Sequence, residues 1–138
     1  MSLFRQDAHP LRFLRRDNSG RIAGMKVLFV CTANKLRSPT AEDLFQGLAG
    51  VEVLSAGTDP EAPRPLTAEL VADADLIFAM ETHHRDRIRK KFKQRPRDSR
   101  IITLHIPDEY ERGDPALIEL LETRAGPTIR SLLVADIA

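Results

Sequence analysis

The strongest constraint on the fold of this 138-residue chain is an apolar segment that runs through a short loop into the start of a helix. Residues 27–30 are uninterrupted apolar residues, which is typical of a strand covered on both faces of a sheet. Cys31 follows directly, and Arg37, Ser38 and Pro39 come after five further residues. We expect Ser38 to cap the helix and Pro39 to lie in its first turn. Strand, loop and helix in this order predict the first unit of an α/β fold.

Strand and helix patterns alternate along the rest of the chain. Besides the first strand, apolar runs predict strands at 51–54, 74–80 and 100–105. Helices are predicted at about 39–49, 66–72, 82–93, 115–125 and 128–135, with a Gly-Pro pair separating the last two. Such alternation gives parallel strands joined by right-handed crossovers. The expected fold is therefore a three-layer α/β sandwich with a four-stranded parallel sheet.

The first 24 residues have a composition of their own. They contain five arginines and two aspartates, whereas the whole chain carries a formal charge of only +1. The Asn-Ser-Gly sequence at 18–20 is typical of a turn. We therefore expect residues 1–24 to be an N-terminal extension, either an accessory hairpin or a disordered arm, and residues 25–138 to be the catalytic domain. Met25 is an alternative natural start of the protein.

Composition narrows the class of protein. Apolar residues make up 42% of the chain and charged residues 30%, which is typical of a soluble globular domain. No apolar run approaches the roughly 18–20 residues that a membrane-spanning helix needs. Cys31 is the only cysteine, so an intramolecular disulfide is excluded, as expected for a cytoplasmic protein. We expect no cofactor and no nucleic-acid or membrane partner, and the oligomeric state is open.

Two groups of polar residues are interpreted as solvent-exposed residues without a binding or catalytic role. Nine basic residues lie within 85–100 against two aspartates, and they indicate a solvated basic helix face. His83 and His84 are adjacent, so we expect their side chains to point in different directions on a helix. That arrangement lacks the spacing of a metal site, and no metal is predicted.

The loop after the first strand has the chemistry of a phosphate cradle. Backbone N–H groups at a helix N-terminus bind anions, and a guanidinium can hold two phosphate oxygens at once, which predicts that role for Arg37. The same positive surroundings favour a cysteine thiolate, so Cys31 is the predicted nucleophile. The residues predicted to surround the phosphate are Thr32, Ala33, Asn34, Lys35, Leu36, Arg37 and Ser38.

With these residues in place, the chain resembles the low-molecular-weight protein-tyrosine phosphatases. The positions that match the family's loop and the helix after it are Cys31, Asn34, Arg37, Ser38, Pro39, Ala41 and Glu42. Residues 55–58 and 75–81 also resemble the family's segments at its second and third strands. The resemblance implies that Ser38 hydrogen-bonds the thiolate and that Asn34 supports the loop. Leu36 is a departure, because many members have a second cysteine there.

A general acid is expected in the loop after the fourth strand, because the leaving oxygen needs a proton. Asp108 and Tyr110 match the acid loop of the family, Asp-Pro-Tyr, with Glu109 in place of its proline. We therefore predict that Asp108 is the acid and that Tyr110 forms part of the substrate rim. Asp114, which precedes a proline, is the alternative acid. It is also a typical helix N-cap, and a carboxylate engaged in that way makes a poor proton donor.

The resemblance implies a phosphatase of the protein-tyrosine-phosphatase type that forms a phosphocysteine on Cys31. Its substrate would be a phosphoprotein or a small aryl phosphate. A preference for phosphotyrosine is doubtful, because residues 58–76 form a short segment without aromatic side chains. Two alternatives stay open. One is a non-catalytic module that binds phosphate or a phosphoprotein, and the other is an arsenate reductase that depends on an external thiol.

Overall fold

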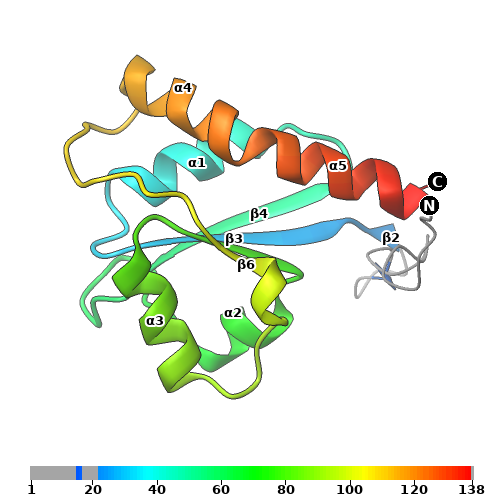
Figure 1. Cartoon of the computed structure of the whole chain (residues 1–138), viewed down its shortest axis with the longest axis horizontal. Coiled ribbons are helices and arrows are strands. Elements are labelled where there is room, and N and C mark those ends of the chain that lie inside the picture. Colours follow the sequence, from blue (N-terminus) through cyan, green and yellow to red (C-terminus); the bar gives the residue numbers. More distant parts are fainter. Residues whose placement is uncertain (1–14, 17–21, 138) are drawn as a thin grey trace.

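The computed structural model describes residues 15–16 and 22–137 (Figure 1). The strands of its main sheet are β3 (Met25–Cys31), β4 (Val51–Gly57), β5 (Leu76–Ala79) and β6 (Ile101–Thr103). The helices are α1 (Arg37–Phe45), α2 (Ala68–Asp73), α3 (Thr82–Lys91), α4 (Pro115–Arg124) and α5 (Gly126–Ile137), with a 3-10 turn, η2, at Asp98–Arg100. The four strands and five helices lie within a few residues of the predicted positions, and η2 was not predicted.

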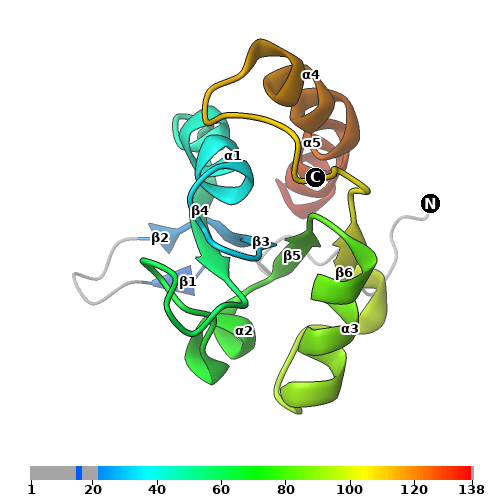
Figure 2. The same ribbon diagram turned by 90° about the vertical axis from the view of Figure 1, so that its left-hand side faces the viewer.

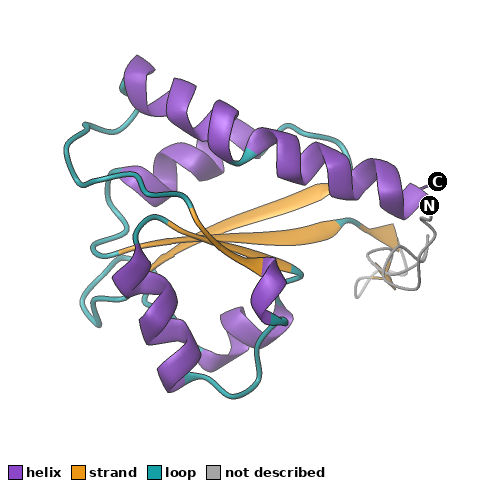
Figure 3. Ribbon diagram, viewed as in Figure 1, coloured by secondary structure: helices purple, strands orange, loops and turns teal. Residues whose placement is uncertain are grey.

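The main sheet is parallel and has the strand order β4-β3-β5-β6. Helices α1, α4 and α5 cover one face, and α2 and α3 cover the other (Figures 1 and 3). The predicted three-layer α/β sandwich is therefore confirmed.

A second, two-stranded sheet precedes the main one. Strands β1 (Arg15–Arg16) and β2 (Ile22–Ala23) pair in antiparallel fashion. This pairing is compatible with an accessory hairpin, although the turn expected at 18–20 lies outside the described residues. The division into an extension, 1–24, and a catalytic domain, 25–138, stays a prediction.

Strand β3 supplies side chains to both hydrophobic layers. Val27, Phe29 and Cys31 belong to the core under α1, α4 and α5, and Leu28 and Val30 to the core under α2 and α3. Successive side chains of a strand point to opposite faces, so a strand covered on both sides must be apolar throughout. The same alternation directs the thiol of Cys31 towards the layer that contains α1.

All four strands of the main sheet end at the same edge. Because the strands are parallel, the loops that follow β3, β5 and β6 meet there, as in other open α/β sheets with sites at the carboxyl ends of strands. Figure 2 looks onto this edge of the molecule. Cys31 and Arg37 flank the loop that follows β3, and Asp108 lies on the loop that follows β6.

The start of α1 differs from the prediction. The helix begins at Arg37 after the N-cap residue Leu36, so Ser38 lies inside its first turn and is not its cap. The hydroxyl of Ser38 is directed to Cys31 instead, 3.0 Å from its sulfur. Pro39 lies in the first turn, as predicted. The capping prediction was wrong because the side chain has a partner in the preceding loop.

The two C-terminal helices are close to the predicted ones. Asp114 caps α4, and its carboxylate accepts a hydrogen bond of 2.9 Å from the backbone N–H of Ala116. Helix α5 already begins at Gly126, because the first turn of a helix tolerates the proline that follows. In the part of the chain that the structure describes, no helix is both long and apolar enough to cross a membrane.

Candidate active site

The loop between β3 and α1 folds around the sulfur of Cys31. The backbone N–H of Asn34 donates to Sγ over 3.2 Å, and the hydroxyl of Ser38 lies 3.0 Å from the same atom. The Nδ2 amide of Asn34 donates to the Ser38 oxygen over 2.9 Å, so that oxygen already accepts a hydrogen bond. The hydroxyl hydrogen of Ser38 is therefore available to donate to the sulfur. Two hydrogen-bond donors are therefore directed at one sulfur.

Asn34 holds the loop in its turn. Its φ of 57° lies in the left-handed region, which asparagine adopts more readily than most residues. Its amide also donates to Ser55 of β4 over 2.9 Å, and its side-chain oxygen accepts from the backbone N–H of Arg64 over 3.2 Å. The side chain is almost fully buried. Asn34 thus links the loop to the neighbouring strand, which supports the role implied by the resemblance.

The end of β4 packs directly against the loop. The backbone N–H groups of Thr58 and Asp59 donate to the carbonyls of Cys31 and Thr32, over 2.9 and 3.0 Å. A Cβ atom at Gly57 would lie 2.5 Å from the carbonyl oxygen of Thr32, so this approach requires glycine. The 55–58 segment noted in the sequence is therefore one wall of the cradle.

Arg37 is buried, and one nitrogen of its guanidinium is fixed by hydrogen bonds to the protein. Its Nη1 donates to Oε1 of Glu81 over 2.6 Å and to the carbonyl of Ile106 over 2.9 Å. These two bonds use both hydrogens of Nη1. The Nε–H and Nη2–H groups on the other edge of the guanidinium are left to bind an anion in bidentate fashion. Nε lies 3.7 Å from Oδ1 of Asp108, so the expected acid faces the same edge.

Glu81 lies two residues after the end of β5 and was not identified as a site residue from the sequence. The hydrogen bond from Arg37 lowers the pKa of Glu81, and the charge of Arg37 acts in the same direction. The carboxylate therefore stays ionised and orients the guanidinium. A carboxylate placed shortly after a buried strand, at the edge where the site lies, is the signal that could have found it.

A pocket of about 170 Å³ opens above the sulfur. Its lining residues are Cys31, Ala33, Lys35, Leu36, Arg37 and Asp108. The structure thus brings together the three predicted catalytic residues. Tyr110 packs against the hydrophobic core and is not among the lining residues, and Asp114 is engaged as the cap of α4. The position of Asp108 supports its choice over Asp114 as the acid.

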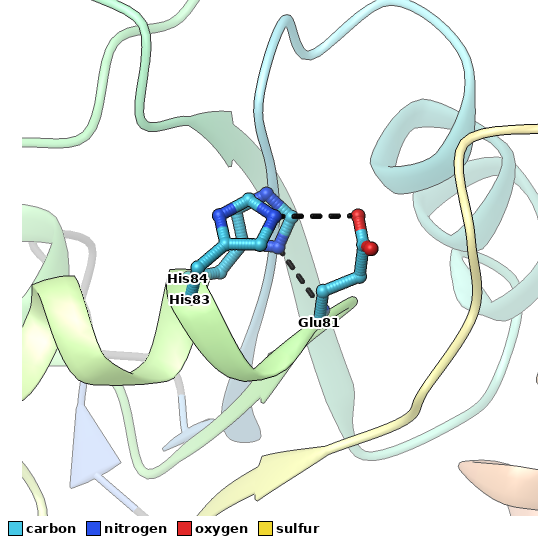
Figure 4. A group of neighbouring side chains, drawn as sticks. All are labelled: Glu81, His83 and His84. Atoms are coloured by element: carbon cyan, nitrogen blue, oxygen red, sulfur yellow. Dashed lines mark hydrogen bonds and ion pairs between the residues drawn. The ribbon is translucent and has the colours of Figure 1, made fainter.

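Glu81, His83 and His84 lie side by side at the start of α3 (Figure 4). The two imidazole rings are 4.0 Å apart between centroids, so the expectation that they point in different directions was wrong. The ligand atoms of the three residues lie within 4.8 Å of one another, as in a metal site. However, both ring nitrogens of His84 already have hydrogen-bond partners, namely the backbone N–H of Glu81 and the hydroxyl of Thr32. A metal ion would have to displace one of them, and we assign no metal site here.

Comparison with known proteins agrees with this geometry. The model of the family described as "Low molecular weight phosphotyrosine protein phosphatase" matches residues 26–63, which include the loop and β4. The chain is 36% identical to the protein-arginine-phosphatase of Bacillus subtilis (strain 168) over 116 residues, covering 64% of this chain and 74% of that protein. It is 30% identical over 115 residues to the low molecular weight protein-tyrosine-phosphatase PtpB of Staphylococcus epidermidis, covering 66% and 81%.

Solved structures show the same fold. The tyrosine phosphatase Wzb from Escherichia coli K30, in complex with phosphate, matches with a TM-score of 0.63 at 22% identity over 78% of this chain and 97% of that one. The YwlE arginine phosphatase from Geobacillus stearothermophilus matches with a TM-score of 0.52 at 27% identity, over 80% and 89%.

Fold, loop and relatives together define the class of protein as an α/β phosphatase with a cysteine in its phosphate loop. Within that class, the chain belongs to the low molecular weight phosphotyrosine protein phosphatase family. Its relatives are named for acting on two different phosphorylated side chains, and the substrate of this protein is a separate question.

Proposed function

We propose that the protein hydrolyses phosphorylated protein side chains or small aryl phosphates through a phosphocysteine on Cys31. One observation carries this proposal. The sulfur of Cys31 accepts from the loop and lies in the same small pocket as Arg37 and Asp108. Thiol-based phosphoryl transfer requires three groups, namely a nucleophile, a cation that can bind phosphate in bidentate fashion and a carboxyl group. All three lie in this pocket.

In the first step, the thiolate of Cys31 attacks phosphorus as the bond from phosphorus to the leaving group breaks. Asp108 gives its proton to the leaving atom, which is an oxygen in an aryl phosphate and a nitrogen in phosphoarginine. The Nε–H and Nη2–H groups of Arg37 bind two of the three outer oxygens, and N–H groups of the loop bind the charge that develops there. The products of this step are a phosphocysteine and a protonated leaving group.

In the second step, water attacks phosphorus and the sulfur–phosphorus bond breaks. Asp108, now a carboxylate, takes the proton of the water. The thiolate of Cys31 leaves, and the hydroxyl of Ser38, 3.0 Å away, donates a hydrogen bond to it. The site returns to its starting state with inorganic phosphate as product.

The proposed substrate is a phosphoprotein. The Bacillus subtilis relative is named for phosphoarginine and the Staphylococcus epidermidis relative for phosphotyrosine, so both side chains are candidates. Lys35 lines the pocket, so its ammonium group would add positive charge beside a bound phosphate. We further propose a catalytic domain at 25–138 preceded by an extension at 1–24, and a cytoplasmic location.

The test measures hydrolysis of an aryl phosphate, a phosphotyrosine peptide and a phosphoarginine peptide. We expect wild type to hydrolyse at least one of them, vanadate to inhibit it, and Cys31→Ser to abolish turnover. Acid quenching during turnover should trap a phosphoryl group on Cys31, detected by mass spectrometry. Activity that persists in Cys31→Ser would sink the mechanism.

Two further measurements on wild type, binding of inorganic phosphate and reduction of arsenate, separate the alternatives. A wild-type protein that binds inorganic phosphate tightly but releases none from any substrate is a binding module. Reduction of arsenate that requires an added thiol, without phosphatase activity, would identify the reductase.

A further inference from the structure

His84 lies between the two halves of the phosphate cradle. Its Nε2 is 2.8 Å from the hydroxyl of Thr32, the second residue of the loop. Its Nδ1 is 3.0 Å from the backbone N–H of Glu81, whose carboxylate holds Arg37. One imidazole therefore contacts the loop on one side and the residue that supports the guanidinium on the other.

The hydrogen bonds fix the protonation state of the ring. A backbone N–H can only donate, so Nδ1 of His84 must offer its lone pair to Glu81. The neutral ring then carries its hydrogen on Nε2, which donates to the oxygen of Thr32. Only this one form of the ring can make both bonds, and a charged imidazolium would lose the bond to Glu81.

The surroundings of His84 favour that neutral form. The residue is fully buried, and burial lowers its pKa to about 4, with His83 and Arg37 acting in the same direction and Glu81 opposing them. Both ring nitrogens are hydrogen-bonded, and breaking either bond would leave a buried polar group without a partner, which is costly. Its two partners are Thr32, which follows the nucleophile Cys31, and Glu81, whose carboxylate holds Arg37.

We propose that His84 is a positioning residue of the phosphate cradle, in which its neutral imidazole ties Thr32 of the loop to Glu81 and thereby to Arg37. Its role rests on the function proposed above, because the cradle is positioned for phosphate. The backbone N–H of Thr32 and the fork of Arg37 must meet one phosphate at the same time. A small displacement of either half weakens every bond to the phosphate, both in the bound ground state and in the transition state.

Three variants test the hydrogen bond between His84 and Thr32. Asn has a side-chain oxygen near the position of Nδ1, so His84→Asn can keep the bond to Glu81 but is too short to reach Thr32. Thr32→Val removes the acceptor hydroxyl at constant shape. The double variant completes the cycle. His105→Asn is the matched control, because His105 is exposed and its φ of 57° suits asparagine.

The readouts are kcat/KM, the inhibition constant of inorganic phosphate and the free energy of unfolding, measured where every variant is fully folded. We expect His84→Asn and Thr32→Val each to lower kcat/KM and phosphate affinity about tenfold. The double variant should be no worse than either single one, because both remove the same bond. His105→Asn should change neither quantity by more than about twofold.

Three results would overturn the proposal. They are full activity and phosphate affinity in His84→Asn, losses that multiply to about a hundredfold in the double variant, and a change confined to the free energy of unfolding. Failure of the proposed function looks different, because wild type would then hydrolyse nothing. Phosphate binding would still test His84 in that case, and a wild type that binds no phosphate would overturn the positioning role as well.

Discussion

The phosphate loop, residues 31–38, and the acid loop, residues 104–114, meet at one pocket but differ in their burial. In the phosphate loop, Cys31, Asn34 and Arg37 are 2%, 6% and 2% exposed, and each is hydrogen-bonded. The acid loop carries Asp108 with 64% of its side chain exposed. One half of the site is part of the core, and the other half lies on the surface.

The acid loop is fixed at its ends and exposed in its middle. At its start, the backbone N–H of Ile106 donates to the carbonyl of Met80 over 2.8 Å. Near its end, the backbone N–H of Gly113 donates to the hydroxyl of Thr40 over 3.0 Å. Groups that stabilise charge must be held in place before the reaction, whereas an acid must let the substrate enter. Changes at the buried positions of the phosphate loop should therefore alter both stability and activity, and loss of the exposed Asp108 carboxyl should alter activity alone.

The largest effect should come from Arg37→Lys. Lysine keeps the charge but cannot reproduce a fork that is bound to Glu81 on one edge and to phosphate on the other. We expect kcat/KM to fall about a thousandfold, in line with the loss of a transition-state donor in other enzymes. Arg87→Lys, at an exposed position of α3, is the matched control and should be neutral. Near wild-type kcat/KM in Arg37→Lys would show that charge alone is sufficient.

The second effect tests the acid loop. Asp108→Asn removes the proton donor, and we expect kcat to fall about a hundredfold for substrates with poor leaving groups and less for good ones. The free energy of unfolding should stay within about 0.5 kcal/mol of wild type, because the side chain is exposed. Asp114→Asn is the matched control, since asparagine caps a helix as well as aspartate. A larger loss in Asp114→Asn would reverse the assignment of the acid.

The same contrast explains what the sequence could and could not predict. The apolar run before Cys31 and the spacing to Arg37 predicted the sheet, the loop and the nucleophile, because these depend on local pattern. The hydrogen-bond partners of Arg37 and Asn34 lie in β4, in the segment after β5 and in the acid loop. Only the folded structure brings these segments together. Glu81 and His84 were missed for this reason. The place of Glu81 after a buried strand was a signal for a site residue, but its bond to Arg37 and the bond of His84 to Thr32 are long-range contacts that no spacing along the chain indicates.

The third effect compares stability in the two loops directly. Asn34→Ala removes the side-chain bonds to Ser38 and Ser55 and places alanine at a left-handed φ. We expect the free energy of unfolding to fall by about 2 kcal/mol in urea titrations. Glu109→Ala in the acid loop is the matched control and should cost less than about 0.5 kcal/mol. Equal losses at the two positions would remove the distinction between a core loop and a surface loop.

The smallest effect concerns the pH dependence of stability. The pKa of His84 is about 4 in the folded protein and near 6.5 in an unfolded chain, so the unfolded state binds more protons between these values. Stability should therefore fall as the pH is lowered from about 6.5 towards 4, and His84 should account for about 1–2 kcal/mol of the fall between pH 7.5 and 5. The lowered pKa of Glu81 acts only below its ordinary value of 4.5, outside this window.

The measurement is urea unfolding of wild type, His84→Asn and the control His105→Asn at several pH values. His84→Asn should have a flatter profile than wild type, and His105→Asn is the control for loss of an imidazole from an exposed position. Identical slopes in wild type and His84→Asn would mean that the ring is protonated as easily in the folded protein as in the unfolded one. The hydrogen bond that Nδ1 accepts from Glu81 would then contribute nothing to the neutral form, and the ring would not tie Thr32 to Glu81.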